Sequence, residues 1–235
     1  MLTKDFWAKY FHVYDVLNLV IPYQDLLSEI VKESQVQPGS FVLDAGAGTG
    51  NLAVKLEEKG AQVVAIDFSE EALRRYRLKN PAARTHIMDL TQELTIFIDN
   101  SFDIVVSNNV LYNIPRSKRQ DVITELYRII KPGGRIVLAN VHQKFAPRII
   151  YLETVKENLK RHGLLSTVKL VVRMAWPTIK IFYYNILIQK AYKSDKNNLF
   201  EFEEQVELLR TAGFNQISPT KLVYANQAIL NSAQK

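Results

Sequence analysis

The residues with the clearest chemical potential are Asp44 and the three glycines that follow it in the stretch DAGAGTG. Gly46, Gly48 and Gly50 come directly after an apolar run, which predicts a strand, a tight turn and the start of a helix. Glycine allows a ligand to approach the backbone, and the free N–H groups of a helix start favour a negative group. A carboxylate at position 44 would repel a pyrophosphate, but it suits an ammonium beside a carboxylate. The stretch therefore predicts a ligand that carries an amino-acid group.

A nicotinamide dinucleotide fits this turn less well. The dinucleotide fingerprint G-x-G-x-x-G would require its third glycine at position 51, and the chain has Asn51 there. Gly50 instead completes the pattern G-x-G-x-G. The displaced glycine argues against an NAD-dependent oxidoreductase.

Two further acids follow the next two apolar runs. Asp67 ends the run at 63–66, and Asp89 ends the run at 86–88. In an open parallel sheet, ligands bind at the carboxyl ends of the strands, so both acids are expected beside the glycine turn. Each also has a structural interpretation, because Asp67 could cap the following helix and Asp89 could be a turn residue.

Alternating strands and helices must position these residues. Apolar runs predict strands at 41–43, 63–66, 86–88, 103–107 and 135–140, followed by a β-rich tail. Helical spacing occurs at 5–33 with a break at Pro22, from 51 to about 60, and at 69–77, 119–130, 147–161, 164–176, 179–193 and 201–212. Compact apolar strands between helices are typical of a parallel sheet covered on both faces. We therefore predict a doubly wound, Rossmann-like α/β fold with a mostly parallel sheet of about seven strands.

The same rhythm predicts the domain organisation. We expect one domain over 1–235, with helices at 1–37 before the first strand and a helical insertion at 142–198 after the fifth. The chain has no cysteine, which excludes disulfides, thiolate metal sites and a cysteine nucleophile, and we predict no metal site. Its start lacks the apolar segment of a signal peptide, and no apolar run is long enough for a spanning helix. We expect a cytoplasmic protein.

The ordered set of motifs resembles the class I S-adenosylmethionine-dependent methyltransferases. DAGAGTG at 44–50 is similar to the first motif of that family, VVAIDFSEEAL contains Asp67, and HIMDL contains Asp89. The later motifs of the family are similar to three further stretches: SFDIVVSNNVLYNI at 101–114, IIKPGGRIVLAN at 129–140 and FEEQVELLRTAGF at 202–214. The resemblance covers roughly 40–140 and 200–230, and it implies S-adenosyl-L-methionine as the cofactor.

The resemblance also implies roles for particular residues. Asp67 would bind the ribose hydroxyls, and Asp89 with its neighbour would meet the adenine. The expected cofactor-binding residues are Tyr14, Asp44, Ala45, Gly46, Gly48, Gly50, Asn51, Asp67, Phe68, Asp89, Leu90, Asn108 and Asn109. Methyl transfer from a sulfonium depends mainly on alignment, and a general base is optional.

The loop after the fourth strand informs the choice of acceptor. Methyltransferases that act on base amines carry [N/D]-P-P-[Y/F] there, whereas this chain has Asn108 and Asn109 followed by Val-Leu. Many small-molecule relatives have a histidine in this loop, where the chain has Tyr112. His142, just past the fifth strand, is a substitute candidate for a base, or else it is a hydrogen-bonding loop residue. Tyr14 and Tyr112 are two further candidates for a catalytic role, and the identity of the catalytic residue is left open.

The N-terminal stretch YFHVYDVLN at 10–18 resembles the lead-in of the methyltransferases of ubiquinone and menaquinone biosynthesis and their small-molecule relatives. In that group the first helices form a lid over the cofactor, and Tyr14 matches the tyrosine that approaches it. The alternative is an amphipathic helix packed on the sheet, with Tyr14 half-buried.

The positive charge of the chain is concentrated in one segment. Residues 142–193 hold ten Lys or Arg and two Glu, whereas the rest holds 20 basic and 22 acidic residues. In the family this segment builds the acceptor pocket. Apolar bulk with cationic edges suits a hydrophobic, anionic small-molecule acceptor, or a helix in transient contact with acidic lipid, which would make the protein peripheral to a membrane. A helix pair with an ordinary solvated face is the alternative.

The sequence therefore favours a methyltransferase for a small, apolar or lipid-like acceptor. Two other hypotheses stay open: an RNA methyltransferase that grips phosphates with the basic insertion, and a cofactor-binding scaffold without catalysis. Nucleic acid is the less favoured partner because no RNA-binding module is recognisable. The acceptor atom and the oligomeric state are left open.

Overall fold

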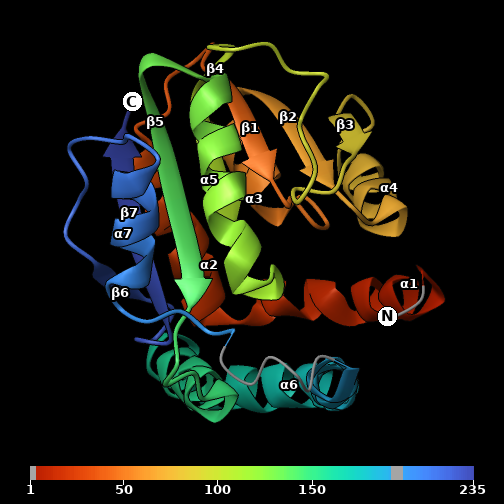
Figure 1. The fold of residues 1–235 in the computed structure, drawn as a ribbon. Coiled ribbons are helices and arrows are strands. Elements are labelled where there is room, and N and C mark those ends of the chain that lie inside the picture. Colours follow the sequence, from red (N-terminus) through yellow and green to blue (C-terminus); the bar gives the residue numbers. More distant parts are fainter. Residues whose placement is uncertain (1–3, 192–197) are drawn as a thin grey trace.

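The structure is a computed structural model that describes residues 4–191 and 198–235. In these residues the strands form one sheet of seven, in the order β3-β2-β1-β4-β5-β7-β6 (Figure 1). The strands are β1 Phe41–Ala45, β2 Gln62–Asp67, β3 Arg84–Ile87, β4 Phe102–Asn108, β5 Ile130–Val141, β6 Lys221–Val223 and β7 Ala228–Gln234.

The pairing of the strands confirms the mostly parallel, Rossmann-like sheet. β1 to β5 pair in parallel, β7 runs antiparallel to β5, and β6 antiparallel to β7. The chain builds outward from β1 through β2 to β3 and then returns to β4 on the other side of β1. The strand order thus reverses between β1 and β4, which is where open sheets of this kind bind ligands.

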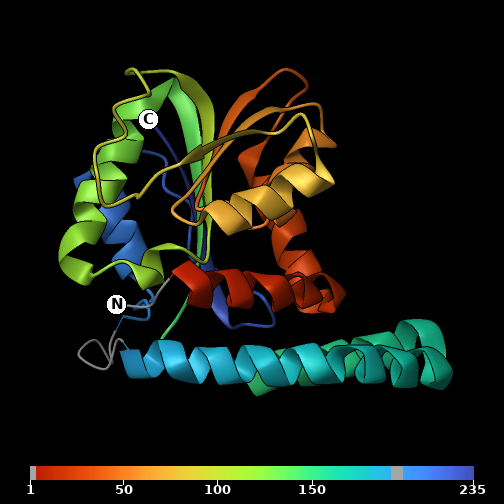
Figure 2. The same cartoon turned by 90° about the vertical axis from the view of Figure 1, so that its right-hand side faces the viewer.

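Helices cover both faces of the sheet. They are α1 Lys4–Tyr14, η1 Asp15–Leu19, α2 Ile21–Ser34, α3 Asn51–Glu57, α4 Glu70–Lys79, η2 Leu111–Asn113, α5 Arg116–Ile129, α6 Pro147–Ala191 and α7 Glu204–Thr211. Figure 2 shows α2 and α4 on one face and α5 and α7 on the other. Two buried apolar clusters follow this division, one under α2 and α3 and the other under α5 and α7. Because both faces are covered, the strands read as continuous apolar runs in the sequence.

The helices α1 and α6 lie at the carboxyl ends of the parallel strands. Both views place α1 between the sheet and α6 (Figures 1 and 2). α6 is a hairpin of two helical segments, because Gly163 has φ 75° and ψ 179° inside it. The N-terminal helices and the insertion therefore meet above the edge of the sheet where the glycine turn lies.

The predicted break between 164–176 and 179–193 is wrong. The helix continues through Pro177, and its only non-helical backbone in the described residues is at Gly163. Met174 and Ile181 lie on either side of Pro177 and are both buried in the core. Their packing holds the helix together despite the backbone hydrogen bond that the proline removes. Residues 192 and 193 of that prediction lie outside the described residues. No helix in the described part of the chain is long and apolar enough to cross a membrane.

Candidate functional site

The glycine turn joins β1 to α3. Gly50 has φ +76°, and a Cβ atom placed on it would lie 2.1 Å from the ring of Tyr76. Gly46 similarly faces Val110 at 2.3 Å, whereas a Cβ atom on Gly48 would lie 3.7 Å from the ring of Phe11 in α1. Protein packing therefore requires glycine at 46 and 50, and Gly48 is the glycine whose outer side faces the N-terminal helix.

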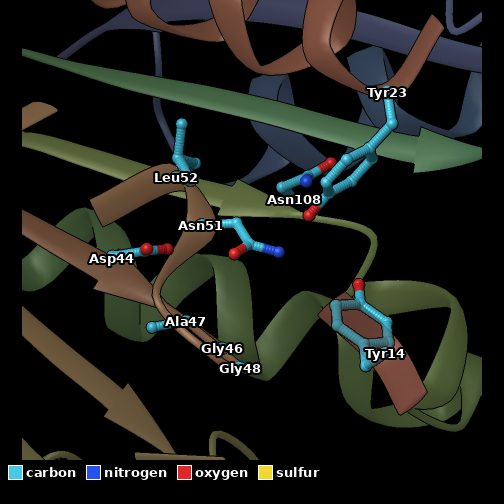
Figure 3. Close-up of a pocket in the computed structure, with 9 residues that line it drawn as sticks. All are labelled: Tyr14, Tyr23, Asp44, Gly46, Ala47, Gly48, Asn51, Leu52 and Asn108. Atoms are coloured by element: carbon cyan, nitrogen blue, oxygen red, sulfur yellow. The ribbon is translucent and has the colours of Figure 1, made fainter. Parts of the chain in front are cut away.

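A small cavity of about 30 Å³ lies beside this turn. Its lining comes from the end of β1, the glycine turn, the starts of α2 and α3, and the ends of β4 and α1: Tyr14, Tyr23, Asp44, Gly46, Ala47, Gly48, Asn51, Leu52 and Asn108 (Figure 3). A cavity of this size holds a water molecule or two, whereas pockets for organic ligands span roughly 300 to 1,000 Å³. Tyr14 and Tyr23 bring the N-terminal helices over the turn and limit the space.

Three polar atoms of the lining are buried without a hydrogen-bond partner among the described residues. They are Asp44 Oδ2, Asn51 Nδ2 and Asn108 Oδ1. Buried polar atoms are normally paired, so each of these three atoms is available for a hydrogen bond with a ligand. Two of them accept and one donates, which matches an ammonium beside a carboxylate.

Asp44 has a strongly shifted acidity. Burial raises its pKa to about 8, and the negative charge of Asp67 adds to the rise. An acid in this setting is stabilised in its charged form by a nearby cation. The site can thus accept a positive group from a ligand at neutral pH.

Asp67 connects the glycine turn with the start of α4. Its Oδ2 atom accepts a hydrogen bond from the amide of Gly48 at 2.9 Å, and its Oδ1 atom accepts one from the amide of Ser69 at 2.8 Å. Burial raises its pKa to about 6 although both amides lower it. The carboxylate therefore has a structural role in shaping the turn, and its contact with a ribose stays a prediction.

The ends of β2 and β3 bring the next group of predicted residues together. The amide of Met88 donates to the carbonyl of Asp67 at 3.0 Å, so Phe68 and Asp89 follow neighbouring strand ends. Asp89 is exposed, and its Oδ1 atom accepts from the amide and the hydroxyl of Thr91, both at 2.8 Å. Phe68 is about half-exposed and Leu90 is buried.

The loop after β4 lies on the opposite side of the turn. Asn108 Oδ1 opens into the cavity, and Asn109, with φ 57°, also has a buried Oδ1 atom without a partner in the described residues. The hydroxyl of Ser107 donates to the carbonyl of Ala45 at 2.8 Å, which fixes β4 against β1. Asn140 accepts from the amide of Leu111 at 3.1 Å, so the end of β5 holds the loop in place.

The structure places His142 in a backbone hydrogen-bond network. It is 2% exposed, its Nε2 atom lies 2.8 Å from the carbonyl of Asn226, and its Nδ1 atom accepts from the amide of Lys144 at 3.1 Å. Because Nδ1 accepts, Nε2 carries the proton and donates. Both ring nitrogens are therefore engaged, which supports the loop interpretation and leaves no nitrogen available as a base.

A polar clasp that the sequence did not predict holds η1 on the glycine turn. The ammonium of Lys79 donates to Asp15 Oδ1 at 2.9 Å, to the carbonyl of Thr49 at 2.8 Å and to Asn51 Oδ1 at 2.6 Å. Thr49 Oγ1 donates to Asp15 Oδ1 at 2.6 Å, and Asn18 Nδ2 donates to Asn51 Oδ1 at 3.0 Å. The clasp ties three segments that are distant in sequence.

The stretch YDVLN at 14–18 contains a signal for part of the clasp. Tyr14 alone is a predicted site residue there, although Asp15 and Asn18 make the contacts to the turn. Lys79 and Tyr23 carry no local signal, because a lysine at a helix end and a tyrosine on an apolar helix face are both common.

Comparison with known proteins agrees with this geometry. Residues 43–138 match the family model described as "Methyltransferase domain". An uncharacterized methyltransferase from Synechocystis sp. is 34% identical over 108 residues, which cover 46% of this chain and 50% of the relative. A demethylmenaquinone methyltransferase from Shouchella clausii is 33% identical over 154 residues, covering 62% of this chain and 65% of the relative.

A solved structure of an S-adenosylmethionine-dependent methyltransferase from Mesorhizobium loti shares the fold. It has a TM-score of 0.59 at 16% identity, with 88% of this chain and 96% of that chain covered. The curated relatives named above are matched over about half to two thirds of their length. By its glycine turn, its strand order and the match over residues 43–138, this chain contains a domain of the class I S-adenosyl-L-methionine-dependent methyltransferase type.

Proposed function

We propose that this chain transfers a methyl group from S-adenosyl-L-methionine to a small, apolar or lipid-like acceptor. The observation that carries the proposal is the set of three unpaired buried atoms beside the glycine turn, on Asp44, Asn51 and Asn108. They match the amino-acid end of this cofactor in number and in polarity.

Different residues of this chain bind different parts of the cofactor in this proposal. Asp44 and Asn108 accept hydrogen bonds from its ammonium, and Asn51 donates to its carboxylate. Two further groups follow the strand ends: Asp67 binds the ribose, and Phe68, Asp89 and Leu90 surround the adenine. Gly46, Gly48, Gly50 and Asn109 shape the backbone around it, and Tyr14 covers it from the N-terminal helix.

When bound, the cofactor supplies a methyl group on a sulfonium, which leaves as a neutral thioether. The protein's task is to align the acceptor with that methyl group and to exclude water. Tyrosines around the cavity cannot act as bases near neutral pH, because burial raises the pKa of Tyr23 to about 12 and that of Tyr14 well above 10. Burial likewise raises the pKa of Tyr112. These hydroxyls stay protonated and can donate hydrogen bonds to acceptor oxygens.

Two observations support an aromatic, apolar acceptor. Five tyrosines gather around the cavity, on α1, α2, η2 and the turn between β6 and β7. Tyr23 and Tyr224 are buried, and Tyr10, Tyr14 and Tyr112 are half-buried. Several curated relatives are named demethylmenaquinone methyltransferase, at 33% to 35% identity. A quinol-like acceptor with a hydrophobic tail fits both, and transient contact with a membrane surface would supply it.

The proposal is tested with purified protein and S-adenosyl-L-methionine that carries an isotope-labelled methyl group. A short-chain prenylated naphthoquinol and a bulk tRNA and rRNA mixture serve as alternative acceptors, with products analysed by mass spectrometry. We expect label in the naphthoquinol. Transfer to RNA would contradict the proposed acceptor class.

Cofactor binding is measured separately by calorimetry with S-adenosylhomocysteine. Wild-type protein is expected to bind it, and Asp44→Asn to lose most of the affinity, because the variant replaces the acceptor oxygen that faces the ammonium with a neutral amide. If wild-type protein does not bind, the methyltransferase proposal itself fails.

A further inference from the structure

The second segment of α6, residues 164–186, has two faces with different environments. Its inner face carries Thr167, Met174 and Ile181, which are seven residues apart and buried in the core. Its outer face carries large apolar side chains at intervals of three and four, all exposed: Leu165, Val168, Val172, Trp176, Ile179, Tyr183 and Ile186. Leu165 and Val172 have 77% and 71% of their surface exposed. A stripe of this kind normally marks an interaction site.

A line of cations borders the apolar stripe. Lys169, Arg173 and Lys180 are four and seven residues apart, so they share one side of the helix. Lys180 Nζ lies 5.2 Å from the ring centroid of Trp176, which places the cation at the edge of the stripe. Among the described residues, these three cations make no salt bridge.

The first segment of the hairpin differs in this respect. There Lys156 pairs with Glu153 at 3.3 Å, and Arg161 pairs with Glu157 at 3.1 Å. Between Glu157 and Asp195 the sequence has no acidic residue. The uncompensated positive charge therefore lies on the segment that also exposes the apolar stripe.

We propose that the outer face of residues 164–186 docks on an anionic lipid bilayer. An exposed apolar arc with cations along its edge is the arrangement by which helices lie in a membrane interface, with the apolar arc among the acyl chains and the cations at the headgroups. A second copy of this chain would bring like charges together. A nucleic acid would leave the apolar stripe uncovered.

The position of the segment links this surface to the site. The inner side of the segment contacts α1, where Tyr184 lies 5.5 Å from Phe6 and 6.2 Å from Tyr10 between ring centroids. α6 forms the base of the molecule, with α1 between it and the sheet (Figure 2). A bilayer on the outer face of α6 would thus lie one helix away from the tyrosines around the cavity.

The test uses the full chain and vesicles of phosphatidylcholine with or without phosphatidylglycerol, compared by co-sedimentation at low and high salt. Each basic residue near an anionic surface contributes about 1 kcal/mol, so three predict affinity for anionic vesicles on the order of a hundredfold greater at low salt. Lys169→Gln/Arg173→Gln should lower that affinity by at least about tenfold. Lys59→Gln/Lys118→Gln, two exposed cations on other elements, should leave it unchanged.

The apolar stripe is tested with Val172→Gln/Ile179→Gln, against Ile98→Gln as an exposed apolar control elsewhere. The stripe variant should lose binding to anionic vesicles, and the control should keep it. The tryptophan emission of the wild-type protein should shift to shorter wavelength on binding, and Trp176→Phe should lose the shift. A circular-dichroism spectrum and an unfolding temperature like those of the wild-type protein show that each variant is folded.

Equal binding to neutral and anionic vesicles, or full binding by the stripe variant, would overturn the proposal. So would dimerisation in the absence of lipid that depends on Val172 and Ile179, because it would make a second copy the occupant. The assay needs no methyl acceptor, so its outcome is independent of the proposed function.

Discussion

The ammonium of Lys79 lies 2.6 Å from Asn51 Oδ1, which joins the last turn of α4 to the first residue of α3. The same ammonium lies 2.9 Å from Asp15 Oδ1 at the start of η1. One lysine therefore holds the N-terminal segment on the glycine turn, over a cavity too small for the cofactor. We infer that this segment must move for the cofactor to enter.

The variant Lys79→Met is expected to loosen this segment. It removes hydrogen bonds to Asp15, Thr49 and Asn51 while it keeps the length of the side chain. Amide hydrogen exchange in residues 4–19 should become faster, because local opening of this segment becomes easier. Lys59→Met, an exposed lysine of the turn after α3, is the control. Equal exchange rates in the wild type, Lys79→Met and Lys59→Met would show that Lys79 does not hold this segment in place.

Cofactor affinity should depend on pH through Asp44. Its pKa is raised to about 8, and an ammonium binds the ionised form, so affinity for S-adenosylhomocysteine should rise about tenfold per pH unit between pH 6.5 and 7.5 and level off near 8. Calorimetry across this range provides the measurement. A flat profile would show that Asp44 does not meet the ammonium.

The ionised form of Asp44 should also lower the free energy of unfolding of the protein without cofactor. Its pKa in the folded state lies above the value of about 3.9 in an unfolded chain, so the folded state binds more protons between these values. Stability is therefore lost as the pH rises from about 4 to 8. Asp44→Asn should flatten this loss in urea unfolding while it weakens cofactor binding. If the stability of Asp44→Asn fell with pH as steeply as that of the wild-type protein, Asp44 would not be the cause of the loss.

Gly50→Ala is expected to destabilise the fold through Tyr76. The positive φ costs about 1 to 2 kcal/mol for a residue with a Cβ atom, and the clash with the ring adds about 1 to 3 kcal/mol. Gly39→Ala separates the two effects, because Gly39 has φ +87° and a Cβ atom placed on it would have no neighbour within 4 Å. Chemical denaturation should show the larger loss for Gly50→Ala; equal losses would mean that the ring moves away freely.

Arg119→Met should destabilise the loop that carries Tyr112. The guanidinium of Arg119 is fully buried, donates to the carbonyls of Leu111 and Ile114 at 3.2 and 3.3 Å, and pairs with Glu204. Removing one partner of a buried ion pair costs about 3 to 5 kcal/mol. Thermal unfolding checks this. Arg116→Met, which removes a more exposed arginine next to Glu204, should cost much less.

The sequence alone determined the fold class, and it selected the residues of the candidate site. Continuous apolar runs report strands buried on both faces, and residues at successive strand ends must meet at one edge of a parallel sheet. Asp44, Asp67 and Asp89 could be selected on this basis because strand ends are visible in local patterns. The break between the predicted helices at 147–161 and 164–176, where Gly163 lies, was likewise visible in the local sequence pattern.

Tertiary structure decided what those patterns cannot report. Gly50 is required by Tyr76, 26 positions away, and Lys79 reaches Asn51 only because β1 and β2 place α3 beside α4. In the sequence His142 was a candidate base, but in the structure its Nε2 atom is hydrogen-bonded to the carbonyl of Asn226, 84 positions away. The outer stripe of α6 resembles a core-facing stripe in the sequence, because periodicity identifies an apolar face but not what covers it. Long-range packing alone separates a buried face from an exposed one.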